Sequence, residues 1–179
     1  MEKNTGPIDR LIKIAVVGPE STGKSTLSEK LAAHFHTTWV REYAREYIDQ
    51  LPVPYQQEDL EIIAKGQLEA EKRMEGLASR ILICDTNLIV IKIWSEFKYG
   101  FCPAWIEEEI ARSNYDLHLL TYIDIPWEED PQREHPDKRA LLYSMYKKEL
   151  ESLKVNFVEV KGDMNTRLDT AVSAVNALL

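Results

Sequence analysis

Residues 18–25 read GPESTGKS, which fits the pattern G-x-x-x-x-G-K-[ST]. The apolar run LIKIAVV at residues 11–17 precedes this stretch, and the helix-like segment TLSEKLAAHF at residues 26–35 follows it. A strand, a glycine-containing loop and a helix in this order are typical of a P-loop, whose backbone N–H groups surround a phosphate. The stretch therefore predicts an α/β fold with a phosphate site at the end of its first strand.

The residue types in the loop explain how it would bind a nucleotide. Gly18 and Gly23 permit backbone angles that turn successive N–H groups toward the phosphates. The helix that follows directs its positive end at the same anion. Lys24 is expected to reach the β- and γ-phosphates, and the Ser25 hydroxyl is expected to ligate Mg²⁺. The variable positions complete the predicted nucleotide contacts: Glu20, Ser21 and Thr22.

Length and composition fit one soluble domain. The chain has 179 residues, 44% of them hydrophobic, and its 22 basic and 30 acidic residues give a net charge of −8. An acidic protein is a poor match for a nucleic-acid surface. Cys84 and Cys102 lack metal-type spacing, and no apolar run has the length of a membrane span or a signal peptide. We expect a cytoplasmic protein without nucleic-acid or membrane partners, with a lead-in at 1–10 and one domain at 11–179.

The hydrophobic pattern alternates between strands and helices along the whole chain. Strands are predicted at residues 11–17, 37–40, 80–85, 117–125 and 155–160. Helices are predicted at residues 26–35, 41–50, 58–74, 88–94, 104–112, 138–153 and 166–179. This alternation predicts a three-layer α/β/α P-loop NTPase fold with a five-stranded parallel sheet. In such folds ligands bind beyond the carboxyl ends of the strands, so the chemistry is expected there.

Asp85 ends the buried strand RILICD and is followed by Thr86. A P-loop protein has at this place the acidic residue that holds Mg²⁺, directly or through water. The alternative is that Asp85 caps the helix after it.

Arg41, Glu42 and Arg45 follow the second predicted strand. A carboxylate at this edge can accept the proton of a substrate hydroxyl, and guanidinium groups can hold an anion or a polar ring. All three are therefore candidates for substrate binding. The alternative is a solvated helix start, in which these charges are ordinary surface neighbours.

The segment PWEEDPQREHP at residues 126–136 contains three prolines and many charges, and we expect a mobile lid at about 126–139. Arg133 lies within it and Arg139 just after it. Phosphoryl transfer requires cations over the transferring oxygens, and mobile loops commonly supply them on closure. The alternative is an ordinary charged surface.

Together these residues resemble the ribosylnicotinamide kinase domain of NadR-type proteins, a P-loop kinase family. The motifs that carry the resemblance are GPESTGKSTL at 18–27, REYAREY at 41–47, CDT at 84–86 and PWEEDPQR at 126–133. It extends from about Leu11 to the final strand. Because only ten residues precede the first strand, the resemblance implies a stand-alone kinase domain.

The resemblance implies ATP-dependent phosphorylation of the ribose hydroxyl of nicotinamide riboside, with ATP and Mg²⁺ as cofactors. Lys24, Ser25 and Thr26 would hold ATP and Mg²⁺, Glu42 and Arg45 would face the substrate, Asp85 would serve the metal, and Arg133 would come from the lid. Arg41 stands where the family has a tryptophan that stacks on the nicotinamide ring. The acceptor therefore stays open between nicotinamide riboside and another nucleoside or vitamin.

Three functional hypotheses remain. The first is a small-molecule kinase in which Glu42, or alternatively Asp85, takes the proton of the hydroxyl. The second is a regulatory ATPase; a GTPase switch is disfavoured because no N-K-x-D element occurs, and an AAA-type motor because no separate helical domain follows. The third is a nucleoside monophosphate kinase, with Arg41 and Arg45 clamping the acceptor phosphate. The sequence predicts no oligomeric state.

Overall fold

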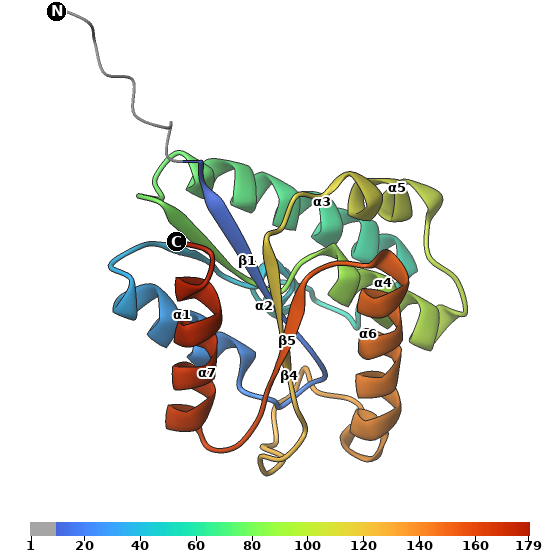
Figure 1. The fold of residues 1–179 in the computed structure, drawn as a ribbon. Helices are drawn as coiled ribbons and strands as arrows, with labels where there is room; N and C mark the ends of the chain where they lie inside the picture. The colour runs from blue at the N-terminus through green and yellow to red at the C-terminus, as the bar shows by residue number, and fades with distance from the viewer. Residues whose placement is uncertain (1–9) are drawn as a thin grey trace, which may run out of the picture.

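The computed structural model describes residues 10–179, so the predicted lead-in lies outside the described residues except for Arg10. Within this range five strands form one parallel sheet in the order β2-β3-β1-β4-β5. Their bounds are β1 Ile12–Val17, β2 Trp39–Val40, β3 Ile81–Asp85, β4 Leu117–Thr121 and β5 Phe157–Val160. The first strand is central, so the P-loop leaves the middle of the sheet at its carboxyl edge, the lower edge in Figure 1.

Helices cover both faces of the sheet (Figure 1). One face carries α1 (Lys24–His34) and α7 (Met164–Asn176). The other carries α3 (Gln57–Glu75), α4 (Leu88–Tyr99), α5 (Ala104–Arg112) and α6 (Arg139–Leu153). The short α2 (Tyr43–Asp49) packs on α3, and a 3-10 turn (Pro136–Lys138) precedes α6. The predicted α/β/α fold is confirmed. Within residues 10–179, no helix has both the length and the apolar character needed to cross a membrane.

Alternate side chains of β1 belong to different layers, as the period of two in a strand requires. Ile12, Ile14 and Val16 are buried against α1 and α7. Lys13 points to the opposite face, where its Nζ pairs with Glu71 at 3.2 Å and Glu75 at 2.8 Å on α3. Lys13, the single charged residue in the apolar run of this strand, thus belongs to a buried ion pair.

The observed elements differ from the predicted ones mainly at two ends. Helix α4 continues beyond Trp94 to Tyr99, because Gly100 adopts φ +83 and its N–H caps the carbonyl of Glu96. Strand β4 ends at Thr121 rather than Ile125, and the chain turns there toward the lid. Both differences concern where an element stops, and neither changes the order of strands.

Gly66 sets the distance between α2 and α3. A Cβ atom at this position would overlap the ring of Tyr43. Replacing Gly66 by alanine is therefore expected to lower the free energy of unfolding by about 1–3 kcal/mol, the usual cost of overpacking, despite the better helix propensity of alanine. Urea unfolding measures this. The control is Gly76→Ala, which should be close to neutral, since its added Cβ would lie in ordinary contact, 3.7 Å from the carbonyl oxygen of Arg73. An unchanged midpoint for Gly66→Ala would contradict the contact.

His118 on β4 makes folding stability depend on pH. Burial lowers the pKa of His118 to about 4, whereas an unfolded histidine titrates near 6.5. Between these values the unfolded state binds a proton that the folded state does not, so stability falls as the pH decreases. From pH 7 to pH 5 this amounts to about 2 kcal/mol. Urea unfolding at both pH values measures this. The fall in the free energy of unfolding from pH 7 to pH 5 should be smaller in His118→Gln than in the original protein, by about 2 kcal/mol. Equal decreases in both proteins would contradict the prediction.

Candidate active site

The P-loop fits against the end of β4. At Gly18, which has φ +144, a Cβ would collide with the hydroxyl of Thr121 and lie 2.9 Å from its carbonyl oxygen. Gly23 has φ +77, a left-handed conformation that favours glycine. Both glycines of the motif are therefore required by backbone geometry, one by close approach and one by its angle.

Side chains of the loop hold it from within. The hydroxyl of Thr22 donates to the carbonyl oxygen of Pro19 at 2.8 Å and lies 2.7 Å from the hydroxyl of Thr121. The Nζ of Lys24 donates to the same Pro19 carbonyl at 2.8 Å. These bonds hold the loop in a curled conformation, and its residues from Gly18 to Thr26 line one cavity of about 490 Å³.

Ser25 and Asp85, the two residues expected to serve Mg²⁺, lie in contact with each other. The Ser25 hydroxyl donates to Oδ2 of Asp85 at 2.5 Å, while Oδ1 of this buried carboxylate has no partner among the described residues. Burial, and then the charge of Glu42, raise the pKa of Asp85 to about 7. Asn87, rather than Asp85, caps α4, since its side chain accepts the N–H of Ile89.

This pair fits a Mg²⁺ ion. A hydroxyl and a carboxylate with an unpaired oxygen are the hard oxygen ligands that Mg²⁺ prefers, and a cation would relieve the buried charge. Among residues 10–179 no group of three or more His, Cys, Asp or Glu side chains forms a metal site alone. An ion here would therefore depend on Ser25, Asp85, water and substrate phosphates, as P-loop sites do.

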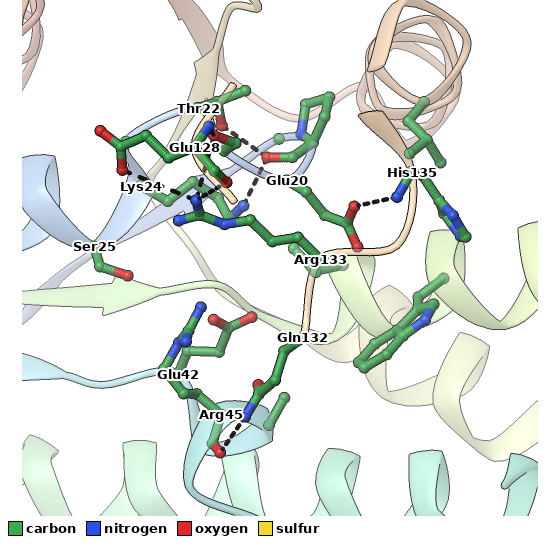
Figure 2. A pocket seen from close by; sticks show the side chains of 18 of the residues that line it. Glu20, Thr22, Lys24, Ser25, Glu42, Arg45, Glu128, Gln132, Arg133 and His135 are labelled. Carbon is green, nitrogen blue, oxygen red and sulfur yellow. Dashed lines mark hydrogen bonds and ion pairs between the residues drawn. The ribbon is translucent and has the colours of Figure 1, made fainter. Parts of the chain in front are cut away.

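The P-loop holds the backbone of the lid through two side chains, of which Figure 2 labels Glu20. The carboxylate of Glu20 accepts the N–H groups of Glu134 at 3.1 Å and His135 at 3.0 Å. The hydroxyl of Ser21 accepts the N–H of Glu128 at 2.9 Å. The segment predicted as a mobile lid therefore lies closed over the phosphate site.

The two arginines of the lid region have different positions. Arg133 lines the cavity, and its Nη1 donates to the carbonyl of Glu128 at 2.6 Å and to Ser21 Oγ at 3.4 Å. Arg139 donates instead to the carbonyls of Ser21 at 3.1 Å and Ile125 at 3.0 Å. Of the two candidates, only Arg133 lines the cavity beside the P-loop, whereas Arg139 stabilises the backbone of the P-loop and of the segment after β4.

Of the three candidates after β2, two line the cavity. Glu42 and Arg45 face the P-loop from the opposite side, with the lid between them (Figure 2). Arg45 pairs with Asp130 of the lid at 2.9 Å. The structure does not bring Arg41 to the cavity, because its exposed guanidinium lies over the ring of Trp39, 5.5 Å from the centroid.

An apolar wall lies beside Glu42, and the sequence did not single it out as a site. It comes from α2, α4 and α6, and it consists of Ala44, Ile48, Val90, Ile93, Trp94, Phe97, Leu142 and Tyr146. On sequence pattern these side chains are indistinguishable from core, because the same helical faces are apolar in both cases. The apolar residues of the REYAREYID segment were the available signal.

A curled glycine loop at the centre of a parallel sheet, a Ser–Asp pair and an arginine-bearing lid define a P-loop nucleotide-binding domain. Residues 13–167 match a protein-family model described as an AAA domain, and the chain belongs to this family.

Similar proteins include kinases. The chain is 29% identical over 152 residues to the trifunctional NAD biosynthesis/regulator protein NadR of Escherichia coli (strain K12), covering 82% of this chain and 35% of that protein. A crystal structure of NadR in complex with NR matches at a TM-score of 0.78 and 22% identity, covering 93% of this chain and 50% of that one. A second, in complex with NAD and AMP-PNP, matches at a TM-score of 0.79 and 24% identity, covering 93% of this chain and 49% of that one. A deoxyadenosine kinase from M. mycoides shares the fold at TM-score 0.67 and 14% identity, with 93% and 100% coverage. The resemblance to NadR is confirmed, and the chain spans about a third to a half of the length of the NadR proteins that it matches.

Lys24 is expected to be essential for binding a nucleoside triphosphate. Lys24→Ala removes the only flexible cation within the motif, so ATP affinity should fall at least about tenfold, because a charge-assisted bond contributes about 1.5–3 kcal/mol. Titration calorimetry with ATP and Mg²⁺ measures the loss. The matched control is Lys148→Ala on the exposed side of α6, which should bind as the original protein does. Undiminished ATP binding by Lys24→Ala would refute the assigned site.

Proposed function

We propose that residues 11–179 form an ATP- and Mg²⁺-dependent kinase domain that transfers the γ-phosphoryl group to a hydroxyl of a nucleoside-like acceptor. Nicotinamide riboside is the first candidate. The observation that carries the proposal is that Glu42 and the P-loop line one cavity, which also has an apolar wall. This arrangement has room for a triphosphate at one end and an aromatic ring at the other.

The reaction follows from the positions of the side chains. ATP phosphates bind the curled loop and Lys24, and Ser25 and Asp85 would hold Mg²⁺, which neutralises phosphate charge. The acceptor oxygen forms a bond to the γ-phosphorus while the bond to the ADP oxygen breaks. Glu42 takes the proton of the hydroxyl; Asp85 is the alternative base. Arg133, which lines the cavity, would contact the transferring oxygens, and the lid that carries it would limit the access of water.

The acceptor end of the cavity favours a nucleoside over a nucleoside monophosphate. Arg45 lines the cavity together with Glu42, and its guanidinium pairs with Asp130. Arg41, which a phosphate clamp would also require, lies outside over Trp39. The two arginines that such a clamp requires therefore do not both line the cavity.

The same geometry supports a positively charged ring such as nicotinamide. A cation such as Arg41 inside the cavity would repel a positively charged ring, but the Arg41 guanidinium lies outside it, over Trp39. The rings of Trp94, Phe97 and Tyr146 line the cavity, and aromatic faces attract cations. The relative NadR is described as a NAD biosynthesis protein, and one of its crystal structures is a complex with NR. Both facts also favour this acceptor.

The acceptor and the base can be tested together. With ATP and Mg²⁺, a screen of nicotinamide riboside, other nucleosides, their monophosphates and thiamine should give the highest kcat/KM with nicotinamide riboside. Glu42→Gln should lower kcat at least about 100-fold, since general base catalysis contributes 10²–10⁴. The KM for ATP should change little. Glu46→Gln, in the first turn of the helix that follows Glu42, is the control. Near-normal turnover by Glu42→Gln would remove Glu42 from the role of base, and a monophosphate as the best acceptor would overturn the nucleoside assignment.

The second candidate is a regulatory ATPase, favoured by the match to an AAA domain model. ADP release without any acceptor separates the two functions. We expect it to be slow until an acceptor is added. Full turnover in ATP and Mg²⁺ alone would favour the ATPase.

A further inference from the structure

Arg167, in the first turn of α7, is a fully buried charged residue outside the motifs. None of its surface is exposed, and it ranks among the largest completely buried side chains of the described chain. Burying a guanidinium is costly unless its N–H groups are bonded. Its position therefore has to be explained by its partners.

These partners come from three separate segments. Nη1 donates to the carbonyl oxygen of Thr22 at 2.8 Å, Nε to that of Gly162 at 2.7 Å, and Nη2 to that of Tyr122 at 2.9 Å. The guanidinium also pairs with the carboxylate of Asp124. One side chain thus joins the P-loop, the chain after β4 and the turn between β5 and α7.

The bond to Thr22 fixes one peptide plane of the P-loop. In a planar trans peptide the N–H of Gly23 points away from the carbonyl of Thr22. That carbonyl points at Arg167, which does not line the cavity, whereas Gly23 does. The Gly23 N–H is therefore directed away from the protein interior, toward the space expected to hold a phosphate.

The turn between β5 and α7 is tied into the same network. The N–H of Gly162, which has φ +89, donates to Asp124 at 2.6 Å while its carbonyl accepts from Arg167. Two residues later Met164 lines the cavity, and its methyl group would lie 3.1 Å from a Cβ placed on Gly23. The network thus supports the loop and the adjoining cavity wall together.

We propose that Arg167 is a positioning residue for the bound nucleotide, which orients the Thr22–Gly23 peptide so that the loop holds the phosphate groups. The inference rests on the proposed nucleotide-dependent function. Arg167 acts through the P-loop and touches no substrate itself.

The test compares phosphate binding in two variants of Arg167. Arg167→Gln should weaken ADP and inorganic tripolyphosphate at least about tenfold in calorimetry, as expected for a lost charge-assisted bond. In steady-state kinetics the KM for ATP should rise by a similar factor while the KM for the acceptor stays within about twofold. Arg167→Lys keeps the charge but fewer donors, and its ADP affinity should be intermediate. If Arg167→Gln does not fold, Arg167→Lys alone supplies the comparison.

The matched control is Lys13→Gln. Lys13 is also a buried cation, paired with Glu71 and Glu75, but it lies at the opposite end of β1 from the P-loop. This variant should lose thermal stability and keep its ADP affinity. The inference is overturned if folded Arg167 variants bind ADP as the original protein does, or if Lys13→Gln weakens ADP equally. Failure of the unaltered protein to bind ADP or ATP would instead refute the nucleotide function, so the two failures are distinguishable.

Discussion

The close approach of Gly18 to Thr121 is the constraint on which the site depends. It lets the loop leave β1 directly against the end of β4, with no side chain between the two backbones. Thr121 then bonds both sides of the junction, donating to the carbonyl of Val17 at 3.1 Å and lying 2.7 Å from the hydroxyl of Thr22. Because β1 is the central strand, every other site residue is arranged relative to this contact.

The loop also depends on side chains from distant elements. A loop that turns its N–H groups toward an anion must turn carbonyl oxygens away from it, and these oxygens need donors. Arg139 supplies one for Ser21 and Arg167 supplies one for Thr22. The two arginines lie 118 and 145 residues from their partners, so the lid and the last helix both support the phosphate site.

The fold and the centre of the site could be predicted because their signals are local in sequence. The strand–loop–helix motif, the buried strands and the acidic end of β3 each occupy a few consecutive residues. The pairing of Ser25 with Asp85 followed from the parallel sheet, whose strand ends meet at one edge. In contrast, the separate positions of Arg41 and Glu42 depend on where α2 begins, which is two residues later than predicted. The role of Arg167 depends on contacts across 145 residues, and an apolar wall has the same pattern as core.

The bonds from Glu20 and Ser21 to the lid backbone have a consequence for the order in which substrates arrive. A ligand that enters beneath the lid requires these three bonds to open first, so the measured affinity is reduced by the rarity of the open form. A first ligand that keeps the lid raised would spare the second this cost. Two substrates without any mutual contact would then assist each other's binding through a shared gate.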